Sequence, residues 1–231
     1  MKLYFVVKRV FDIIASVLGI VITSPFWILA VIGIEISDPG PVFYKANRIG
    51  KGNKPFKMYK FRSMLIDNNA DEKSFKADAN RIFKFGKFIR DFKIDELPQL
   101  LNILNGTMSV VGPRPAAEDQ VGITRGGKYS KASDVKPGLT GPGALYDYIY
   151  GDTVDDEDEY IEKVLPTRLE LEICYIDKMG IFYDINMIWY TVLCILHSVI
   201  KKEPVKIVNE LYKQANISDV KENVEEVTMG E

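Results

Sequence analysis

The longest apolar segment of the chain runs from Ile13 to Ile34 and reads IIASVLGIVITSPFWILAVIGI, without a formal charge. About 20 apolar residues suffice for a helix to cross a bilayer. A secretory signal peptide has a shorter apolar region and ends in a small-residue cleavage site, which Glu35-Ile36-Ser37 does not supply. The sequence therefore predicts a membrane helix within residues 1–37 that stays in the mature protein.

The residues around this segment argue against a simple span. Lys8 and Arg9 precede it, and a basic stretch follows it with Lys45, Arg48, Lys51, Lys54, Lys57, Lys60 and Arg62. The positive-inside rule then places both ends in the cytoplasm. Pro25 has no N–H to donate to the Val21 carbonyl, and the Ser24 hydroxyl can satisfy a freed backbone group. We therefore expect a re-entrant helix hairpin that turns at Ser24-Pro25, with a plain spanning helix as the alternative.

Composition narrows the possible functions. The net charge of -2 argues against a strongly basic nucleic-acid-binding protein, although basic residues outnumber acidic ones by 14 to 5 between residues 41 and 93. Two cysteines, Cys174 and Cys194, are too few for a disulfide framework and indicate a reducing, cytosolic environment. Because His197 is the only histidine, a His-cluster zinc site and a Ser-His-Asp triad are not expected.

Two motifs follow the membrane segment. Strand-like residues 42–44 and 56–59 flank the turn Gly50-Lys51-Gly52-Asn53, which predicts a small β-hairpin. Residues 81–93 carry basic side chains around an apolar stripe at helical spacing, formed by Ile82, Phe85, Ile89 and Phe92. Such a helix suits an anionic membrane surface, and it equally suits a helix that faces a protein core. Because a membrane segment is already present, we expect the interfacial position.

A carboxylate pair stands at the start of the next predicted helix. In residues 94–106, IDELPQLLNILNG, Pro98 suits the first helical turn and Asn105-Gly106 suits the helix end. Asp95 and Glu96 then lie at the helix N-terminus. With a bound diphosphate they would supply the one or two carboxylates that Mg²⁺ prefers. An ordinary helix cap is the alternative for this pair.

The remaining chain predicts short elements and rigid turns. Residues 108–111 form a candidate strand, and the turn Gly112-Pro113-Arg114-Pro115 fixes the direction of Arg114. Residues 137–143, PGLTGPG, predict a rigid glycine-rich loop. Later segments comprise a helix over 165–176, an apolar helix over 185–200 that is short for a membrane span, and a polar, largely disordered tail over 203–231.

Together these elements predict an α+β fold dominated by helices. It combines the N-terminal re-entrant membrane helix hairpin with interfacial amphipathic helices and a small β-hairpin. Residues 38–202 are expected to form one domain on the cytosolic face, between the membrane helix and the tail. The basic surface, the oriented arginines and the carboxylate pair indicate an anionic substrate handled with a divalent metal.

Several long motifs occur in a fixed order between Lys8 and about Ile200: KRVFDIIAS, the Ser24-Pro25 pair, SDPGPVFYKANRIG, KPFKMYKFRSM, GKFIRDFKIDELPQLLNILNGTMSVVGPRP, KPGLTG and YIDKMGIFYDINMI. In these motifs the chain resembles the bacterial sugar transferase family, the monotopic phosphoglycosyl transferases or polyprenyl-phosphate hexose-1-phosphate transferases. It resembles their minimal catalytic form, without the additional N-terminal spanning helices of larger relatives.

The resemblance implies transfer of a sugar 1-phosphate from a UDP-sugar to undecaprenyl phosphate, with release of UMP. It implies a monotopic protein on the cytoplasmic face of the bacterial inner membrane, where the reaction begins assembly of a glycan such as a capsule or an exopolysaccharide. Residues 38–202 would be the catalytic domain, and Mg²⁺ the cofactor. A nucleic-acid partner is not expected, and the sugar and the oligomeric state stay open.

Motif position also implies residue roles. Asp95 would be the nucleophile and Glu96 the Mg²⁺ ligand, with Asp95 as a second ligand if the mechanism is not covalent. Contacts to phosphate or nucleotide would come from Lys60 and Arg114 and, by extension, from Arg48 and Arg90. The chain departs from the family at two places. Position 172 is Glu, where many relatives have Asp. Residues 142–145 are Pro-Gly-Ala-Leu, where relatives often have Trp-Ala-Gln-Val.

The chemistry permits a covalent route through an aspartyl phosphosugar. UMP has a second pKa of about 6, so it can leave without a general acid, and an ionised carboxylate needs no base to activate it. Direct attack by undecaprenyl phosphate in a ternary complex, with both carboxylates on the metal, is the alternative. A catalytically silent module that binds anionic lipid at the membrane surface, and a protein with two membrane spans, are the competing interpretations.

Overall fold

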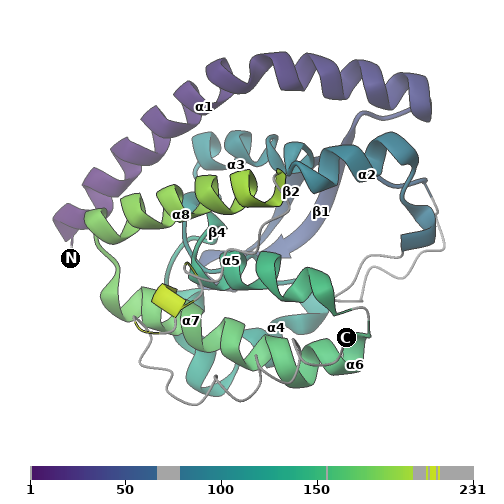
Figure 1. The fold of residues 1–231 in the computed structure, drawn as a ribbon. Helices are drawn as coiled ribbons and strands as arrows, with labels where there is room; N and C mark the ends of the chain where they lie inside the picture. The colour runs from purple at the N-terminus through teal and green to yellow at the C-terminus, as the bar shows by residue number, and fades with distance from the viewer. Residues whose placement is uncertain are drawn as a thin grey trace.

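The computed structural model describes residues 2–66, 79–154 and 156–199, together with residues 207, 209–211 and 213. Helices dominate this part of the chain, with two small two-stranded sheets between them (Figure 1). The helices are α1 Lys2–Ser37, α2 Lys84–Asp91, α3 Gln99–Asn105, α4 Val121–Thr124, α5 Pro142–Ile149, α6 Glu157–Glu159, α7 Leu165–Lys178 and α8 Ile181–Val199. The predicted helix-dominated class is confirmed, as are the two late helices.

The predicted β-hairpin is present and longer than expected. Strand β1, Phe43–Ile49, pairs antiparallel with β2, Pro55–Phe61, and Ala46 lies opposite Met58. Both of these side chains are buried in the main hydrophobic core. The turn between the strands contains Gly52 at a φ of 67°, a left-handed conformation that glycine adopts without strain.

The second sheet contains a strand that the sequence did not predict. Strand β3, Ser109–Val111, pairs in parallel with β4, Gly138–Thr140. The interpretation of residues 137–143 as a loop was therefore wrong. The pairing joins segments distant in sequence and requires the backbones to approach closely, since a Cβ at Gly138 would lie 2.1 Å from the Gly112 nitrogen. Gly138 therefore allows the close approach of two strands and does not mark a loop.

Helix α1 is one continuous helix that contains Pro25 and bends near its middle, so that it arches over α3 and α2 (Figure 1). The Ser24 hydroxyl donates a hydrogen bond of 2.9 Å to the Val21 carbonyl, which is the acceptor that Pro25 leaves free. The expected role of Ser24 is thus confirmed. The two arms of the predicted hairpin are parts of one bent helix, and re-entry into a membrane stays a prediction.

The two faces of α1 differ in their surroundings. One stripe along both arms is buried against the rest of the protein, and it consists of Lys8, Asp12, Ser16, Ala30 and Ile34. The opposite face exposes apolar side chains along its whole length, among them Leu3, Val6, Val10, Ile14, Val21, Ile28, Ile32 and Ile36. Within the described residues, only the helix from Leu3 to Ser37 is long and apolar enough to cross a membrane.

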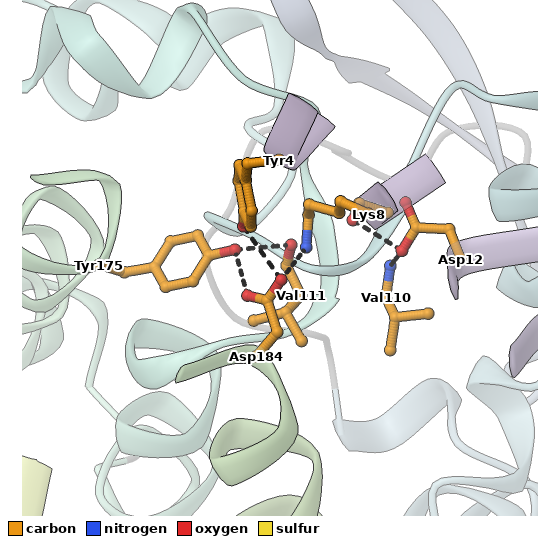
Figure 2. Close-up of polar contacts among 8 residues, drawn as sticks. Tyr4, Lys8, Asp12, Val110, Val111, Tyr175 and Asp184 are labelled. Atoms are coloured by element: carbon orange, nitrogen blue, oxygen red, sulfur yellow. Dashed lines mark hydrogen bonds and ion pairs between the residues drawn. The ribbon is translucent and has the colours of Figure 1, made fainter. Parts of the chain in front are cut away.

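Buried polar contacts fix the first arm of α1 to α7, α8 and β3 (Figure 2). Asp184, at the start of α8, accepts hydrogen bonds from Lys8 at 2.8 Å and from Tyr4 at 3.0 Å. The Tyr175 hydroxyl donates to the other Asp184 oxygen at 2.8 Å. Asp12 accepts from the backbone N–H of Val110 at 2.9 Å. The first arm is therefore part of the folded domain.

The second arm of α1 packs on a smaller hydrophobic cluster with α2 and β2, formed by Ala30, Ile34, Phe61, Ile89 and Ile94. Ile89 on α2 is fully buried, whereas Phe88 on the same helix and Phe92 just after it remain exposed. The predicted apolar stripe is therefore divided, with its Ile89 side facing the protein core. The interfacial position of this helix stays a prediction.

The predicted tail, residues 203–231, falls mostly outside the described residues. Within its described part, Ile207 and Leu211 are helical and buried in the main core. That core also takes Met187 and Cys194 from α8. Helix α8 is therefore a core helix on one side.

Candidate active site

A polar pocket of about 100 Å³ lies where the β-hairpin, the turn around Arg114 and helix α5 meet. Its walls come from segments that are distant in the sequence. Its charged and polar side chains are those of Arg48, Lys60, Glu96, Gln99, Arg114, Gln120, Asp147, Tyr160 and Arg168. Four of the predicted site residues, Arg48, Lys60, Glu96 and Arg114, thus share one pocket.

The carboxylate pair lies in a short 3₁₀ turn, Ile94–Glu96, that precedes α3. The pair was expected at the N-terminus of a helix, and it lies just before α3, in a separate 3₁₀ turn. Pro98 cannot donate to the Ile94 carbonyl, which instead accepts from the Leu97 N–H at 3.1 Å. This bond tightens the turn, and α3 begins only after Pro98. The predicted helix end is confirmed, because Gly106 follows α3 at a φ of 85°.

Lys60 joins the two carboxylates. It projects from β2, and its ammonium lies 3.0 Å from Glu96 Oε1 and 3.9 Å from Asp95 Oδ2. Glu96 is half-buried and lines the pocket, whereas Asp95 is only 4% exposed and lies behind it. The β-hairpin therefore positions the Lys60 ammonium between the carboxylates of Asp95 and Glu96.

The two carboxyl groups have different electrostatic surroundings. Burial raises the pKa of Asp95 above its ordinary value, although the positive charges of Lys60 and Arg90 oppose this rise. Burial also acts on Glu96, but Lys60, Lys93 and Arg114 outweigh it and lower the pKa of Glu96 to about 2. Glu96 is thus firmly anionic at neutral pH. Lys60 is the largest charge that favours the ionised form of Asp95.

The pair fits a magnesium ion that is completed by substrate oxygens. Asp95 Oδ1 is buried and has no hydrogen-bond partner among the described residues. An orphaned carboxylate oxygen of this kind is costly unless a ligand or a reaction uses it. Over the described part of the chain, no cluster of three or more His, Cys, Asp or Glu side chains surrounds a metal position. Mg²⁺ held by one or two carboxylates plus phosphate oxygens matches this donor set.

A chain of polar contacts orients Arg114. Its guanidinium lies 3.3 Å from Asp147 Oδ2. The Tyr160 hydroxyl donates to Asp147 Oδ1 at 2.6 Å and accepts from Arg168 at 2.9 Å. Arg168 in turn lies 3.6 Å from Glu172. Arg114 is therefore held by a buried network as well as by its flanking prolines.

The sequence analysis did not identify Asp147, Tyr160 or Arg168 as site residues. One signal was available for Asp147, which lies in the aromatic stretch Leu-Tyr-Asp-Tyr-Ile-Tyr. An acidic residue within an apolar segment indicates a buried charge with a partner. The sequence did not reveal that partner, because Arg114 belongs to a distant turn.

Glu172 does not line the pocket. It is buried on α7 behind Arg168, and it accepts a hydrogen bond from the backbone N–H of Arg114. Burial raises its pKa, against the opposing charge of Arg168. A Cβ at Gly143 would lie 2.6 Å from Glu172 Cγ. Gly143 therefore leaves room for the Glu172 side chain, so the two positions at which a departure from the family is expected lie in contact.

The two remaining predicted arginines differ in position. Arg48 lines the pocket and donates a hydrogen bond of 2.8 Å to the Asn47 carbonyl. Arg90 lies on α2 and is not part of the pocket wall. Its charge still favours the ionised form of Asp95, so its influence on the pair is electrostatic.

Comparison with known proteins extends these observations. The family model described as "Bacterial sugar transferase" matches residues 3–198. A UDP-glucose:undecaprenyl-phosphate glucose-1-phosphate transferase of Klebsiella pneumoniae is 39% identical over 193 residues, which are 81% of this chain and 39% of that protein. A UDP-N-acetylgalactosamine-undecaprenyl-phosphate N-acetylgalactosaminephosphotransferase of Aeromonas hydrophila is 34% identical over 199 residues, which are 84% of this chain and 44% of that protein. The chain thus spans less than half the length of these two relatives.

A third relative has a similar length. The exopolysaccharide production protein PSS of Rhizobium leguminosarum bv. phaseoli is 35% identical over 199 residues, which are 81% of this chain and 94% of that protein. The family match covers both α1 and the polar pocket. The chain belongs to the bacterial sugar transferase family.

Proposed function

We propose that the protein transfers a sugar 1-phosphate from a UDP-sugar to undecaprenyl phosphate and releases UMP. The observation that carries this proposal is the buried Asp95 carboxylate, which has one oxygen without a hydrogen-bond partner among the described residues and lies beside a pocket rich in cations. The names of the relatives from Klebsiella pneumoniae and Aeromonas hydrophila describe sugar-phosphate transfer to undecaprenyl phosphate. The family relationship supports the same reaction class for this chain.

The pocket suits the diphosphate of the donor. Arg48, Lys60 and Arg114 bring three positive charges to its wall. Arg114 is paired with Asp147, and its side chain is 44% exposed, so it is accessible to a phosphate. A guanidinium can hold two phosphate oxygens in a planar, bidentate geometry. In our proposal these three cations bind the donor and direct its sugar-bearing phosphorus toward Asp95.

Asp95 then acts as the nucleophile. One carboxylate oxygen forms a bond to the phosphorus that carries the sugar, and the bond from that phosphorus to the bridging oxygen breaks. The electron pair of the broken bond leaves with UMP, whose second pKa of about 6 allows departure without a general acid. Lys60 maintains the ionised form of Asp95 before the attack. The product on the enzyme is an aspartyl phosphosugar.

The second half of the reaction regenerates Asp95. A phosphate oxygen of undecaprenyl phosphate attacks the same phosphorus, and the bond from phosphorus to the Asp95 oxygen breaks with its electron pair on the carboxylate. Glu96 would hold the Mg²⁺, which when bound would neutralise charge on the diphosphate oxygens. The low pKa of Glu96, about 2, suits it to remain an anionic ligand throughout.

We propose that α1 enters the membrane from the cytoplasmic face without crossing it. Its first arm is tied to the domain through Lys8 and Asp12, and its second arm through Ala30 and Ile34. If α1 crossed the bilayer, one arm would have to leave the domain and its buried polar groups would lose their partners. The exposed apolar face of both arms can instead lie in the lipid.

Incubation with undecaprenyl phosphate, Mg²⁺ and a panel of UDP-sugars tests the reaction by UMP release. UMP release that needs the lipid acceptor for multiple turnovers, with at least one sugar, is the expected result. Binding of anionic lipid without UMP release from any donor would favour the silent lipid-binding module instead. The same panel identifies the sugar.

A further inference from the structure

A second cavity, which we call the basic cavity, lies beneath the first arm of α1 and has a volume of about 180 Å³. That is far more than the roughly 15 Å³ that one water molecule requires. Its charged lining consists of Lys8, Arg9, Asp12, Lys51 and Lys136. None of its lining residues belongs to the active-site pocket, so the two cavities are separate.

Among the described residues, two of the four cations in the basic cavity have hydrogen-bond or ion-pair partners. Lys8 forms the buried ion pair with Asp184 at 2.8 Å (Figure 2). Arg9 donates to the Ile103 and Leu104 carbonyls at the end of α3, at 2.5 and 2.7 Å. These contacts explain Lys8 and Arg9 as structural residues.

The carboxylate of Asp12 is engaged as well. Its Oδ1 accepts hydrogen bonds from the Ser109 hydroxyl at 3.0 Å and from the Val110 N–H at 2.9 Å. Four cations and the two carboxylates of Asp12 and Asp184 leave a formal surplus of two positive charges. Because Arg9 donates to backbone carbonyls, the surplus is shared by Arg9, Lys51 and Lys136.

Lys136 is the group that demands an explanation. Its side chain is half-buried, and its ammonium makes no hydrogen bond or ion pair with the described residues. Arg9 lies close to it, because a Cβ at Gly106 would be 3.4 Å from Arg9 Nη2 and 3.5 Å from Lys136 Nζ. Burial and the charges of Arg9 and Lys51 lower the pKa of Lys136, with Asp12 opposing. An anion in the cavity would relieve this crowding of like charges.

We propose that the basic cavity binds a phosphate group, with Lys136 and Lys51 as its principal contacts. A phosphate dianion balances the surplus of two charges and accepts hydrogen bonds from both ammonium groups. Phe5 and Met179 form an apolar wall beside these cations, and Lys51 lies over the Phe5 ring at 5.7 Å. This wall can take the carbon atoms of a phosphate ester. The phosphate has two possible sources, a lipid headgroup or a free phosphate.

Acylation of lysines followed by mass spectrometry measures whether phosphate protects Lys136 in the basic cavity. Purified full-length protein is treated with an N-hydroxysuccinimide acetate, in detergent with and without inorganic phosphate, at ionic strength matched with KCl. Without phosphate, Lys136 should react readily, because a lowered pKa leaves more neutral amine. Bound phosphate should slow its acylation severalfold. Exposed Lys54, on the turn between β1 and β2, is the matched control and should not change.

Reconstitution distinguishes the two sources. The same labelling is repeated in vesicles of phosphatidylcholine alone and of phosphatidylcholine mixed with phosphatidylglycerol. Protection of Lys136 relative to Lys54 only with phosphatidylglycerol assigns the cavity to a lipid headgroup. Protection by inorganic phosphate in detergent assigns it to free phosphate. If neither phosphate nor phosphatidylglycerol protects Lys136 beyond the KCl control, the proposal is overturned.

A variant supplies a second measurement. Lys136→Gln removes a charge that has no partner among the described residues, so the protein should fold with an unchanged or higher Tm. In wild type, phosphate should raise Tm by mass action, and in Lys136→Gln this rise should be lost. An equal rise in both proteins would contradict the assigned contact. Neither measurement involves UMP release, so the basic cavity is tested independently of the proposed reaction.

Discussion

The Lys60 ammonium lies 3.9 Å from Asp95 Oδ2, and it is the largest charge that opposes the effect of burial on this carboxyl group. Burial raises the pKa of Asp95, and Lys60 lowers it. If the ionised form of Asp95 is the nucleophile, activity must fall as pH falls through its raised pKa. The acid limb of kcat/KM should therefore lie above about 3.9, the ordinary value for an aspartic acid.

Lys60→Met should move this acid limb to higher pH. The substitution removes a positive charge and leaves the burial of Asp95 in place, so the carboxylate becomes harder to ionise. The pH profile of kcat/KM measures the shift. Lys57→Met, on the same strand but exposed, is the control and should leave the limb where it is. If Lys60→Met lowers kcat/KM at every pH and leaves the acid limb at the same pH, Lys60 does not control the ionisation of Asp95.

Gly143 and Glu172 should behave as a compensating pair. Gly143→Ala places a Cβ 2.6 Å from Glu172 Cγ and should destabilise the protein by about 1–3 kcal/mol through overpacking. Thermal unfolding should show a loss of about 2–4 °C in Tm per kcal/mol. Adding Glu172→Asp shortens the side chain that the new Cβ meets, so it should restore part of the lost Tm. The rescue should be incomplete, because the Arg168 carbonyl oxygen still lies 3.0 Å from the Cβ.

The control for this pair is Gly122→Ala, at a helical position with nothing within 4 Å of the added Cβ. It should be neutral or slightly stabilising, because alanine favours a helix more than glycine does. An equal loss of Tm from Gly143→Ala in the wild-type and the Glu172→Asp backgrounds would show that the two positions are independent.

Arg114→Lys should lower kcat/KM by about 10- to 100-fold, because an ammonium cannot reproduce a bidentate guanidinium contact to phosphate and such charged hydrogen bonds are worth about 1.5–3 kcal/mol. Arg114 also pairs with Asp147, so folding has to be checked by circular dichroism and Tm. A folded Arg114→Lys enzyme with wild-type turnover would reduce Arg114 to a structural residue.

Single cysteines should report both ends of α1 on one side of the membrane. Leu3→Cys lies in the first turn of α1 and Lys54→Cys lies beyond its C-terminal end, and each is made in a background with Ser at positions 174 and 194. An impermeant maleimide should label both or neither in oriented vesicles, since both arms pack on the same domain. Labelling of only one of the two would show that α1 crosses the bilayer.

Local sequence signals predicted the elements whose cause is local. Pro25 with Ser24, and Gly106 at the end of α3, could be interpreted correctly because each acts on its own turn of helix. The β-hairpin was predicted because its strands are joined by a short turn. The Asp95-Glu96 pair was found from its motif, although the 3₁₀ geometry caused by Pro98 was not foreseen.

Features that depend on distant pairing were missed. Strand β4 is recognisable only through its parallel pairing with β3, and its glycines resemble those of a loop. The orientation of Arg114 depends on Asp147 and Tyr160, which lie on other elements. A buried acid in an apolar segment indicates that a partner exists, but only the fold shows which residue it is.

The most direct test of the central claim omits the lipid acceptor. Enzyme in stoichiometric amount is mixed with Mg²⁺ and the UDP-sugar that supports turnover, and UMP and intact protein mass are measured. Wild type should release a burst of UMP approaching one equivalent and gain the mass of a phosphosugar on the peptide that contains Asp95. Asp95→Asn should do neither. If wild type releases no UMP without acceptor, carries no adduct and shows intersecting sequential kinetics, Asp95 is not the nucleophile and transfer proceeds directly in a ternary complex.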